Sequence, residues 1–344
     1  MAVDPSMIRS AQFMGGRFAR RDLAYPEPLP DEVVVEVDAC GICGSDLHFF
    51  SGETPAPSVC AGHEIVGRIA DASSTFPKGC PVVVEPIVAC GKCRQCNVGE
   101  HNLCPALRIV GTHVPGGFAD AVVVPASSVY PLPSSLDLDA AVLTEPLAVA
   151  THAVAIGTVV AGMHVLVLGG GTIGLLTAFM AGRRGATVTI GVRHPHQRAA
   201  ALRLGIDRVV DGVDDAVVAA TLRDRADVVF ETVGGHAATL PLALGCVRPG
   251  GTVVTLGVFS RPIVLDPLIF LAKEVKLAAA TMYRRSGPHP DFVTALGVLV
   301  EERDRLASLV THRFDLSQIE EAFGVASEKR SGSIKVVVRP SRRL

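Results

Sequence analysis

The sequence predicts an α/β protein built from two domains, and three observations carry this prediction. The first part of the chain is divided by glycine and proline into short segments in which apolar and polar residues alternate. From residue 164 onward, apolar strand-like segments alternate with amphipathic helical stretches. The length of 344 residues also suits two domains better than one.

The alternating segments predict that the first domain is rich in β-structure and barrel-like. They cover residues 32–39, 64–70, 81–86 and 118–125. Glycine and proline lie between them, as is typical of turns between short strands.

The second part predicts a parallel sheet, because strands that alternate with helices are joined by right-handed crossovers. In chain order we expect strand 164–169, helix 172–184, strand 187–192, helix 195–204, strand 227–233, helix 236–247 and strand 252–258. The tail then has helices over 291–302 and 317–328 and a strand over 333–340, and it could rejoin the first domain.

Composition excludes several classes of partner. A chain that is 49% hydrophobic and 19% charged can bury a sizeable core, and its net charge of -2 gives no reason to expect a nucleic acid or an anionic membrane surface. Apolar runs such as HVLVLGGGTIGLL are broken by glycine and are short for a bilayer span. The N-terminus has no export signal, so we expect a cytoplasmic protein with reduced thiols.

Four cysteines, Cys90, Cys93, Cys96 and Cys104, have the spacing of a structural zinc site. Four thiolates fill the tetrahedral shell of zinc and leave no position for a substrate, so such a metal would stabilise a loop. Disulfides or unconnected thiols are the alternative, but disulfides would need an oxidising compartment. We therefore expect a structural zinc lobe over residues 90–104.

A glycine pattern marks the first turn of the second domain. Gly169, Gly171 and Gly174 follow a predicted strand and open a predicted helix with G-x-G-x-x-G spacing. Such glycines allow a tight turn and let backbone amides approach a pyrophosphate at the helix N-terminus. The context predicts a dinucleotide-binding domain.

The residue that selects the dinucleotide is expected about twenty positions further on, and no acid is present there. Arg193 takes its place, with His194 and Arg198 nearby. An arginine cannot accept a hydrogen bond from a ribose 2'-hydroxyl, but it can pair with a 2'-phosphate. NADP(H) is therefore favoured over NAD(H); the alternative is that these arginines are solvated surface charges.

A second set of metal-ligating residue types lies in the first domain. Cys43, His63, Glu64 and Glu145 offer a thiolate, an imidazole and two carboxylates, which suit a zinc site with an exchangeable position. Because they are spread from residue 43 to residue 145, spacing alone does not show that they meet. On the residues alone, unconnected side chains are the simpler interpretation.

Together these motifs resemble the zinc-dependent medium-chain dehydrogenase/reductase superfamily, which includes alcohol, sorbitol and threonine dehydrogenases. The resemblance rests on GICGSD, AGHEIVG, the four-cysteine lobe, TEPLA, GGGTIG and AFGVASEKRSGSIKVVV, in the family's order. It implies a GroES-like β-barrel catalytic domain over residues 1–155 and 285–344. It also implies a Rossmann domain, a doubly wound parallel sheet, over residues 156–284. The subunits commonly form homodimers or homotetramers.

The resemblance also implies roles for single residues. Cys43 and His63 match the ligands of the catalytic zinc, and Glu64 matches an acid that binds this metal or lies just behind it. Glu145 stands where classical alcohol dehydrogenases carry a cysteine, as in the sorbitol and threonine dehydrogenase branch. Which of the two carboxylates binds the metal at a given step stays open.

Ser45 and His48 match a proton relay, although on the residues alone both could be capping or surface groups. By the same resemblance, we expect the cofactor also to contact Thr172, Ile173, Val233 and Leu256. Phe50 and Phe118 are candidate walls of the substrate pocket, although phenylalanines are usually core residues.

The resemblance thus implies a zinc-dependent alcohol or polyol dehydrogenase with catalytic and structural zinc in each subunit. Zinc lowers the pKa of a bound alcohol, and hydride passes between a secondary alcohol or its ketone and the nicotinamide. The alternatives are a zinc-independent quinone or enoyl reductase on the same fold, and a non-catalytic NADP(H)-binding protein.

Overall fold

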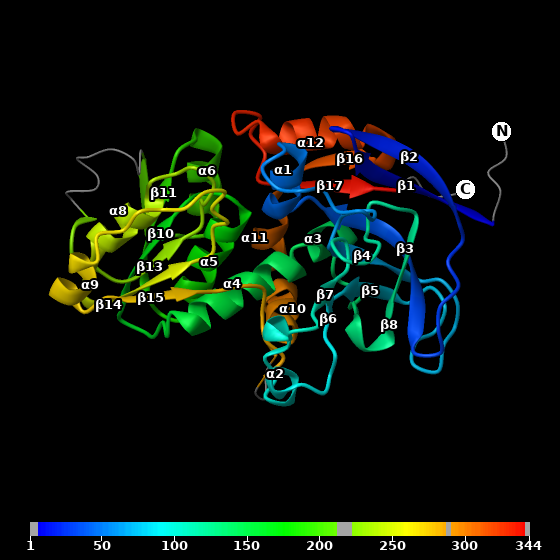
Figure 1. Cartoon of the computed structure of the whole chain (residues 1–344), viewed down its shortest axis with the longest axis horizontal. Helices are drawn as coiled ribbons and strands as arrows, with labels where there is room; N and C mark the ends of the chain where they lie inside the picture. The colour runs from blue at the N-terminus through cyan, green and yellow to red at the C-terminus, as the bar shows by residue number, and fades with distance from the viewer. Residues whose placement is uncertain (1–5, 212–221, 287–289, 341–344) are drawn as a thin grey trace. The chain divides into compact units, whose positions relative to one another are not determined.

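The computed structural model describes residues 6–211, 222–286 and 290–340. The chain divides into two compact units, each described here by itself (Figure 1). The first unit comprises Met1–Glu145, Arg285–Pro288 and Leu296–Leu344, and the second comprises Pro146–Arg284 and His289–Ala295. Parts of the predicted domain ranges, at residues 1–5, 212–221, 287–289 and 341–344, lie outside the described residues. The domain boundaries expected from the sequence stay a prediction.

The first unit is built on a seven-stranded sheet in the order β16-β17-β3-β4-β5-β9, with β8 paired to β3. The strands are β3 (Glu32–Gly41), β4 (Glu64–Ile69), β5 (Pro81–Val84), β8 (Ala121–Pro125), β9 (Val129–Pro131), β16 (Val310–Asp315) and β17 (Lys335–Arg339). The predicted strands of the first domain are all present. The tail does rejoin this unit, because β17 pairs antiparallel with β3.

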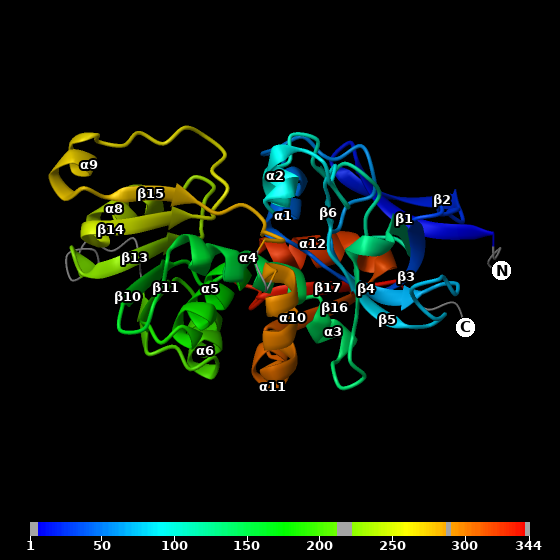
Figure 2. The same ribbon diagram turned by 90° about the horizontal axis from the view of Figure 1, so that it is seen from below.

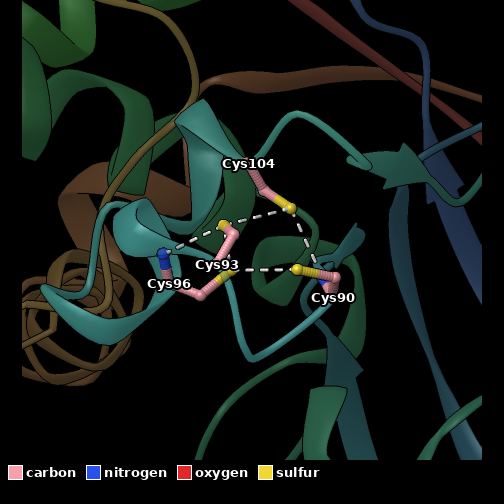
Figure 3. A group of neighbouring side chains, drawn as sticks. All are labelled: Cys90, Cys93, Cys96 and Cys104. Carbon is pink, nitrogen blue, oxygen red and sulfur yellow. Dashed lines mark hydrogen bonds between the residues drawn. The ribbon is translucent and has the colours of Figure 1, made fainter.

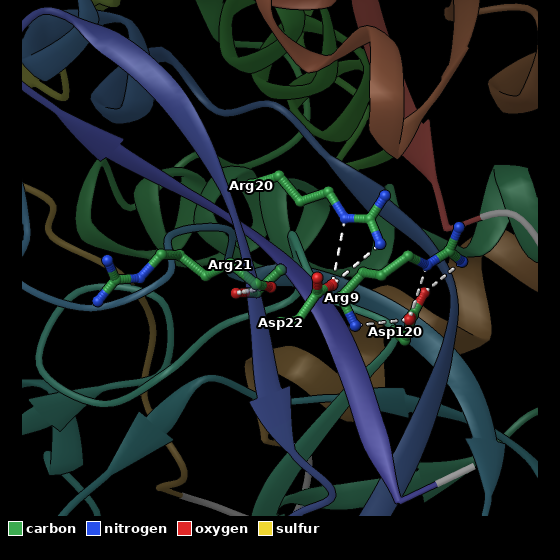
Figure 4. A network of polar contacts seen from close by, with 6 residues as sticks. Arg9, Arg20, Arg21, Asp22 and Asp120 are labelled. Atoms are coloured by element: carbon green, nitrogen blue, oxygen red, sulfur yellow. Dashed lines mark hydrogen bonds and ion pairs between the residues drawn. The ribbon is translucent and has the colours of Figure 1, made fainter. Parts of the chain in front are cut away.

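A hairpin that the sequence did not predict precedes this sheet. It consists of β1 (Met7–Met14) and β2 (Arg17–Ala24). Figure 4 shows how it is fastened: Arg9 donates from its backbone nitrogen and from its guanidinium to Asp120, at 2.7 Å from Nη2 to Oδ1. Since the loop before β8 carries Asp120, this pair ties the N-terminal hairpin to the barrel-like sheet.

Helices and short elements complete the first unit. They are α1 (Gly44–Phe50), β6 (Ile87–Val88), α2 (Arg94–Asn97), β7 (Arg108–Ile109), α3 (Leu138–Ala141), α11 (Arg303–Ala307) and α12 (Ile319–Ser327). Phe323 of α12 packs against Phe18, Phe49, Phe50 and Phe118, with ring centroids 4.6–6.1 Å apart within this cluster. Aromatic packing of this kind stabilises α1 and α12 against the β1–β2 hairpin.

The second unit contains a six-stranded parallel sheet in the order β12-β11-β10-β13-β14-β15. The strands are β10 (His164–Leu168), β11 (Thr187–Val192), β12 (Arg208–Asp211), β13 (Ala226–Glu231), β14 (Val247–Thr255) and β15 (Lys276–Ala279). The strand order reverses between β10 and β13, and ligands of such sheets bind at the carboxyl ends of the strands beside this point.

Helices cover this sheet. They are α5 (Thr172–Arg183), α6 (Pro195–Arg203), α8 (Thr239–Cys246) and α9 (Leu268–Lys273), and Figure 2 shows α5 and α6 on one face and α9 on the other. Helix α8 begins at Thr239 instead of residue 236, where the sequence predicted its start. A turn precedes it: Gly234 and Gly235 have positive φ of 62° and 59°, and Gly235 forms a bridge with Phe259.

Two of the points where the chain passes from one unit to the other lie within helices, α4 (Thr144–Ile156) and α10 (Asp291–Glu301). The stretch Leu138–Ile156 is long and apolar enough to cross a membrane, but 83% of it is buried. Burial of this kind is what a core helix of a globular protein shows.

Candidate functional site

The four predicted structural cysteines come together in one loop (Figure 3). The Sγ atoms of Cys93 and Cys96 are 3.4 Å apart, and Cys90–Cys96 and Cys93–Cys104 are each separated by 3.9 Å. A zinc ion with four sulfurs at about 2.3 Å would separate them by roughly 3.8 Å. The donor set and its spacing therefore fit zinc.

Backbone amides donate hydrogen bonds to these sulfurs. The nitrogens of Cys90 and Cys96 donate to the Sγ atoms of Cys104 and Cys93, each at 3.4 Å. Hydrogen bonds from the amides of Lys92 and Cys93 lower the pKa of Cys90 to about 6. Burial and the neighbouring thiols, by contrast, raise the pKa of Cys96 to about 12. Thiolates are the ligand form, so zinc binding to this loop displaces the thiol protons that it still holds.

The lobe is fastened to the rest of the first unit by Arg285. Its backbone nitrogen donates to Gly99 O at 2.9 Å, while its guanidinium lies 2.7 Å from the fully buried carboxylate of Glu85. Tyr130 donates to the same carboxylate at 2.9 Å. Sequence analysis missed this network, which joins residues 200 positions apart.

The second metal-ligating set also comes together in part. Ligand atoms of Cys43, His63 and Glu64 all lie within 4.8 Å of one another. Cys43 precedes α1, while Glu64 opens β4 and pairs in register with Gly41. A Cβ on Gly41 would lie 1.9 Å from Glu64 Oε2, so only glycine fits opposite this carboxylate.

Glu145 lies beside this cluster without joining that group of ligand atoms in the part of the chain that the structure describes. It stands in the first turn of α4 and is 5% exposed. Burial raises its pKa to about 7; Glu64 adds to this effect, while the charges of His63 and Lys335 oppose it. The sequence-predicted alternative between Glu64 and Glu145 as metal ligand therefore stays open.

Sequence analysis missed a buried cation in this cluster. Lys335 of β17 donates to Glu64 Oε1 at 2.6 Å, to Oε2 at 2.7 Å and to Ile42 O at 2.9 Å. Burial, the largest single effect, lowers the pKa of Lys335, but the charges of Glu64, Cys43 and Glu145 and the hydrogen bonds to Glu64 together outweigh it and raise the value. The signal in the sequence was a lysine inside the apolar strand IKVVV.

Asp46 is a second missed residue. It is 3% exposed, accepts from Cys43 N at 2.9 Å and lies 3.9 Å from His63 Nδ1. That nitrogen has no hydrogen-bond partner among the described residues. Burial by itself lowers the pKa of His63, but the negative charges of Cys43 and Asp46 raise it well above its usual value.

The charge balance of this cluster fits a bound cation. His63 lies among four acidic groups: Cys43, Asp46, Glu64 and Glu145. Among the described residues, Lys335 is the lysine that accompanies them. Buried anions are costly unless cations compensate them. A thiolate, an imidazole and a carboxylate within ligand distance suit zinc in particular.

The two predicted relay residues lie on α1. Ser45 is exposed in the first turn, and His48 follows one turn later and is half-buried. Residues three apart lie on the same side of a helix. The structure also places Glu53 against His48, with 2.7 Å between Oε2 and Nδ1.

The predicted pocket walls have other surroundings. Phe118 is fully buried in the aromatic cluster around Phe323, and Phe50 packs 5.2 Å from the same ring. Both rings contribute to the core of the first unit. A role of either ring as a wall of the substrate pocket stays a prediction.

In the second unit, the glycine turn has the shape that a pyrophosphate needs. Gly169 has a φ of 115°, and a Cβ on Gly174 would lie 2.0 Å from Gly169 O. Gly171 caps α5, and a Cβ there would meet nothing within 4 Å. The helix N-terminus, opened by Thr172 and Ile173, therefore faces open space that an anion can occupy.

The predicted phosphate-selecting residues lie at the end of β11. Arg193 is exposed, and its backbone nitrogen and that of His194 donate to Gln197 Oε1 at 3.0 and 3.2 Å. Arg198 is paired with Asp211, at 2.6 Å from Nη2 to Oδ2. Asp211 thus engages Arg198, and a 2'-phosphate contact of either arginine stays a prediction.

Val233 and Leu256 follow β13 and β14, where Val233 is 39% exposed. Glu231, which sequence analysis missed, lies between them and is fully buried. Its Oε1 accepts from Val233 N at 2.9 Å and Gly234 N at 3.0 Å, and its carbonyl accepts from Leu256 N at 2.8 Å. This residue fixes both loops at the carboxyl edge of the sheet.

Comparison with known proteins agrees with this geometry. Residues 29–134 match the family model "Alcohol dehydrogenase GroES-like domain", and residues 172–301 match "Zinc-binding dehydrogenase". The chain is 33% identical over 337 residues to sorbitol dehydrogenase of Halalkalibacterium halodurans, covering 94% of this chain and 96% of that protein. It is 31% identical to L-threonine 3-dehydrogenase of Anaeromyxobacter sp. (strain K), covering 93% and 94%.

Solved structures agree as well. A putative zinc-binding dehydrogenase from Sinorhizobium meliloti 1021, bound to NADP, superposes with a TM-score of 0.86 at 34% identity, covering 97% of this chain and 100% of that one. For 2R,3R-butanediol dehydrogenase from Bacillus subtilis the TM-score is 0.84 at 28% identity, with the same coverage. The chain therefore belongs to the zinc-dependent medium-chain dehydrogenase/reductase superfamily and is a zinc-type, NAD(P)-dependent alcohol dehydrogenase.

Proposed function

We propose that this enzyme transfers hydride between a secondary alcohol, with a polyol as the favoured class, and NADP+, and that it reduces the corresponding ketone in reverse. The observation that carries this proposal is the buried cluster of Cys43, His63 and Glu64, whose ligand atoms lie within 4.8 Å of one another. A closed tetrathiolate cannot accept a substrate, whereas three ligands leave a position open. We assign catalysis to this cluster and a structural role to the cysteine lobe.

Zinc bound by Cys43 and His63, with Glu64 or Glu145, would supply a Lewis acid that lowers the pKa of an alcohol. Lys335 donates to both oxygens of Glu64, at 2.6 and 2.7 Å. These hydrogen bonds therefore determine how far that carboxylate is available to bind the metal. Ser45 and His48 would carry the released proton outward. Ser45 is exposed and His48 is 20% exposed, which suits a path to solvent.

The proposed preference for NADP(H) rests on Arg193. An arginine at the end of β11 can make charge-assisted hydrogen bonds to a 2'-phosphate, and the sequence has no acid there for a 2'-hydroxyl. The relative from Sinorhizobium meliloti was solved with NADP bound, which supports this proposal. Initial rates with NADP+ and NAD+ test it: kcat/KM should be higher with NADP+, and a large preference for NAD+ would refute it.

The substrate class rests on the relatives. They are named for sorbitol, L-threonine and L-galactonate, which are alcohols carrying further polar groups. A panel of polyols and simple secondary alcohols with NADP+ at alkaline pH, and of ketones with NADPH near neutral pH, tests the proposal. Turnover of secondary alcohols or their ketones supports it, and no turnover by a zinc-loaded, cofactor-binding protein would contradict it.

The alternatives are not favoured. A zinc-independent quinone or enoyl reductase, or a non-catalytic NADP(H)-binding protein, has no need of the clustered ligands and the tetrathiolate lobe. Metal analysis separates the first, because we expect two zinc ions per chain. A homodimeric or homotetrameric assembly, a cytoplasmic location, and the lack of nucleic-acid or membrane partners stay predictions.

A further inference from the structure

The turn after α1 brings an acid back onto the outer relay residue. The carbonyl of His48 accepts from Ser51 Oγ at 3.1 Å, from Glu53 N at 2.9 Å and from Thr54 N at 3.2 Å. Gly52 has a φ of 79°, so the chain reverses where glycine is favoured. The backbone itself therefore carries Glu53 to His48.

The side chains of this pair meet at one defined atom. Glu53 Oε2 lies 2.7 Å from His48 Nδ1, and the two side chains are 30% and 20% exposed. An ionised carboxylate can only accept hydrogen bonds, so the ring must place a proton on Nδ1. In a neutral imidazole, Nε2 is then unprotonated and can accept.

We propose that Glu53 is a positioning residue that holds neutral His48 in the Nδ1–H tautomer and thereby makes Nε2 the proton acceptor of the relay. This inference rests on the proposed function, because it takes His48 to be the outer relay group.

Each proton in the proposed relay can be followed from the substrate to water. During alcohol oxidation Ser45 Oγ receives one proton from the substrate side and gives one to His48 Nε2. The resulting imidazolium is stabilised by its charge-assisted Nδ1–H hydrogen bond to Glu53. Loss of the Nε2 proton to water restores the starting tautomer, and the hydride leaves separately to the cofactor. In ketone reduction the same proton travels inward.

Nitrogen NMR tests the tautomer without turnover. Zinc-loaded, 15N-labelled enzyme is measured without cofactor at alkaline pH, and the His48 signals are identified by their loss in His48→Gln. We expect a pyrrole-type shift at Nδ1 and a pyridine-type shift at Nε2. In Glu53→Ala the Nε2–H form should gain population. An Nε2–H ring in the wild type, or unchanged shifts in Glu53→Ala, would overturn the inference.

A matched control separates this effect from a general loss of surface charge. Glu302 is a half-buried acid, 22% exposed, that pairs with Arg305 at 3.1 Å outside the site. Glu302→Gln should leave the His48 nitrogen shifts unchanged. A shift in the control as large as that in Glu53→Ala would overturn the assignment to the Glu53 contact.

Kinetics test the consequence. Glu53→Ala should lower kcat for alcohol oxidation about tenfold with little change in KM, as loss of a partner that orients a functional histidine does. In a His48→Gln background it should lower kcat no further. An equal loss in both backgrounds would show a role independent of His48 and overturn the inference. An unchanged kcat in His48→Gln alone would instead overturn the relay in the proposed function, while the nitrogen shifts still decide what Glu53 does.

Discussion

Replacement of Lys335 by methionine should strongly destabilise the first unit. Its ammonium makes three contacts of 2.6–2.9 Å with the Glu64 carboxylate and Ile42 O, and the two side chains are 3% and 0% exposed. Three charge-assisted hydrogen bonds of about 1.5–3 kcal/mol each set the upper bound. Removal of one partner of a buried ion pair costs about 3–5 kcal/mol, because the other charge stays buried. We expect Lys335→Met to lose about this much unfolding free energy.

Urea unfolding followed by circular dichroism, at matched zinc content, measures this loss. Lys78→Met is the control, since Lys78 and its partner Asp71 have side chains that are 71% and 79% exposed. An exposed pair contributes at most about 1 kcal/mol.

The double variant Lys335→Met/Glu64→Gln isolates the pair. It should be less destabilised than the sum of its single variants by about 2–3 kcal/mol, because the lone buried charge is then absent. A loss below about 1 kcal/mol in Lys335→Met, or strict additivity in the double variant, would refute the reasoning.

Three further variants test other parts of the structure. Cys96→Ser should reduce zinc by about one ion per chain and lower thermal stability, since a structural site contributes its binding energy to folding; unchanged metal content would exclude the lobe as a zinc site. Arg193→Gln should raise KM for NADP+ by about 10–100-fold with little change for NAD+, in line with loss of a charge-assisted hydrogen bond; equal effects on both cofactors would contradict a 2'-phosphate contact. Lys273→Met should cost about 1–3 kcal/mol of unfolding free energy. The reason is that Lys273 Nζ donates to three carbonyl oxygens beside the end of α8, those of Leu244, Gly245 and Val247, at 3.0–3.2 Å. A loss no larger than that of Lys78→Met would contradict this prediction.

Local patterns in the sequence predicted much of the fold. Four strands and three helices of the second unit follow from periodicity, whereas β12, β15 and α9 were not predicted. The glycine turn needs only the three glycines between 169 and 174. The tetrathiolate loop is predictable for the same reason, because its four ligands lie within one short segment. The hairpin was missed because β2 is mostly exposed and so shows no apolar alternation.

Contacts between distant residues were the part that the sequence could not predict. Lys335 and Glu64 are 271 positions apart, and nothing in either segment indicates that β17 lies beside the cluster. The ion pair between Arg198 and Asp211 of β12 was likewise not predicted. Family resemblance, not spacing, supplied the link between Cys43 and His63, and the structure brings these two together.

The measurement that bears most directly on the mechanism is the zinc dependence of turnover in Cys43→Ala. This variant should retain about one zinc ion per chain, in the cysteine lobe, and should bind NADPH as the wild type does. Alcohol oxidation and ketone reduction should both be abolished, because the thiolate of the exchangeable site is missing. Full activity of Cys43→Ala, or of wild-type enzyme from which the zinc has been removed, would contradict zinc catalysis at this cluster.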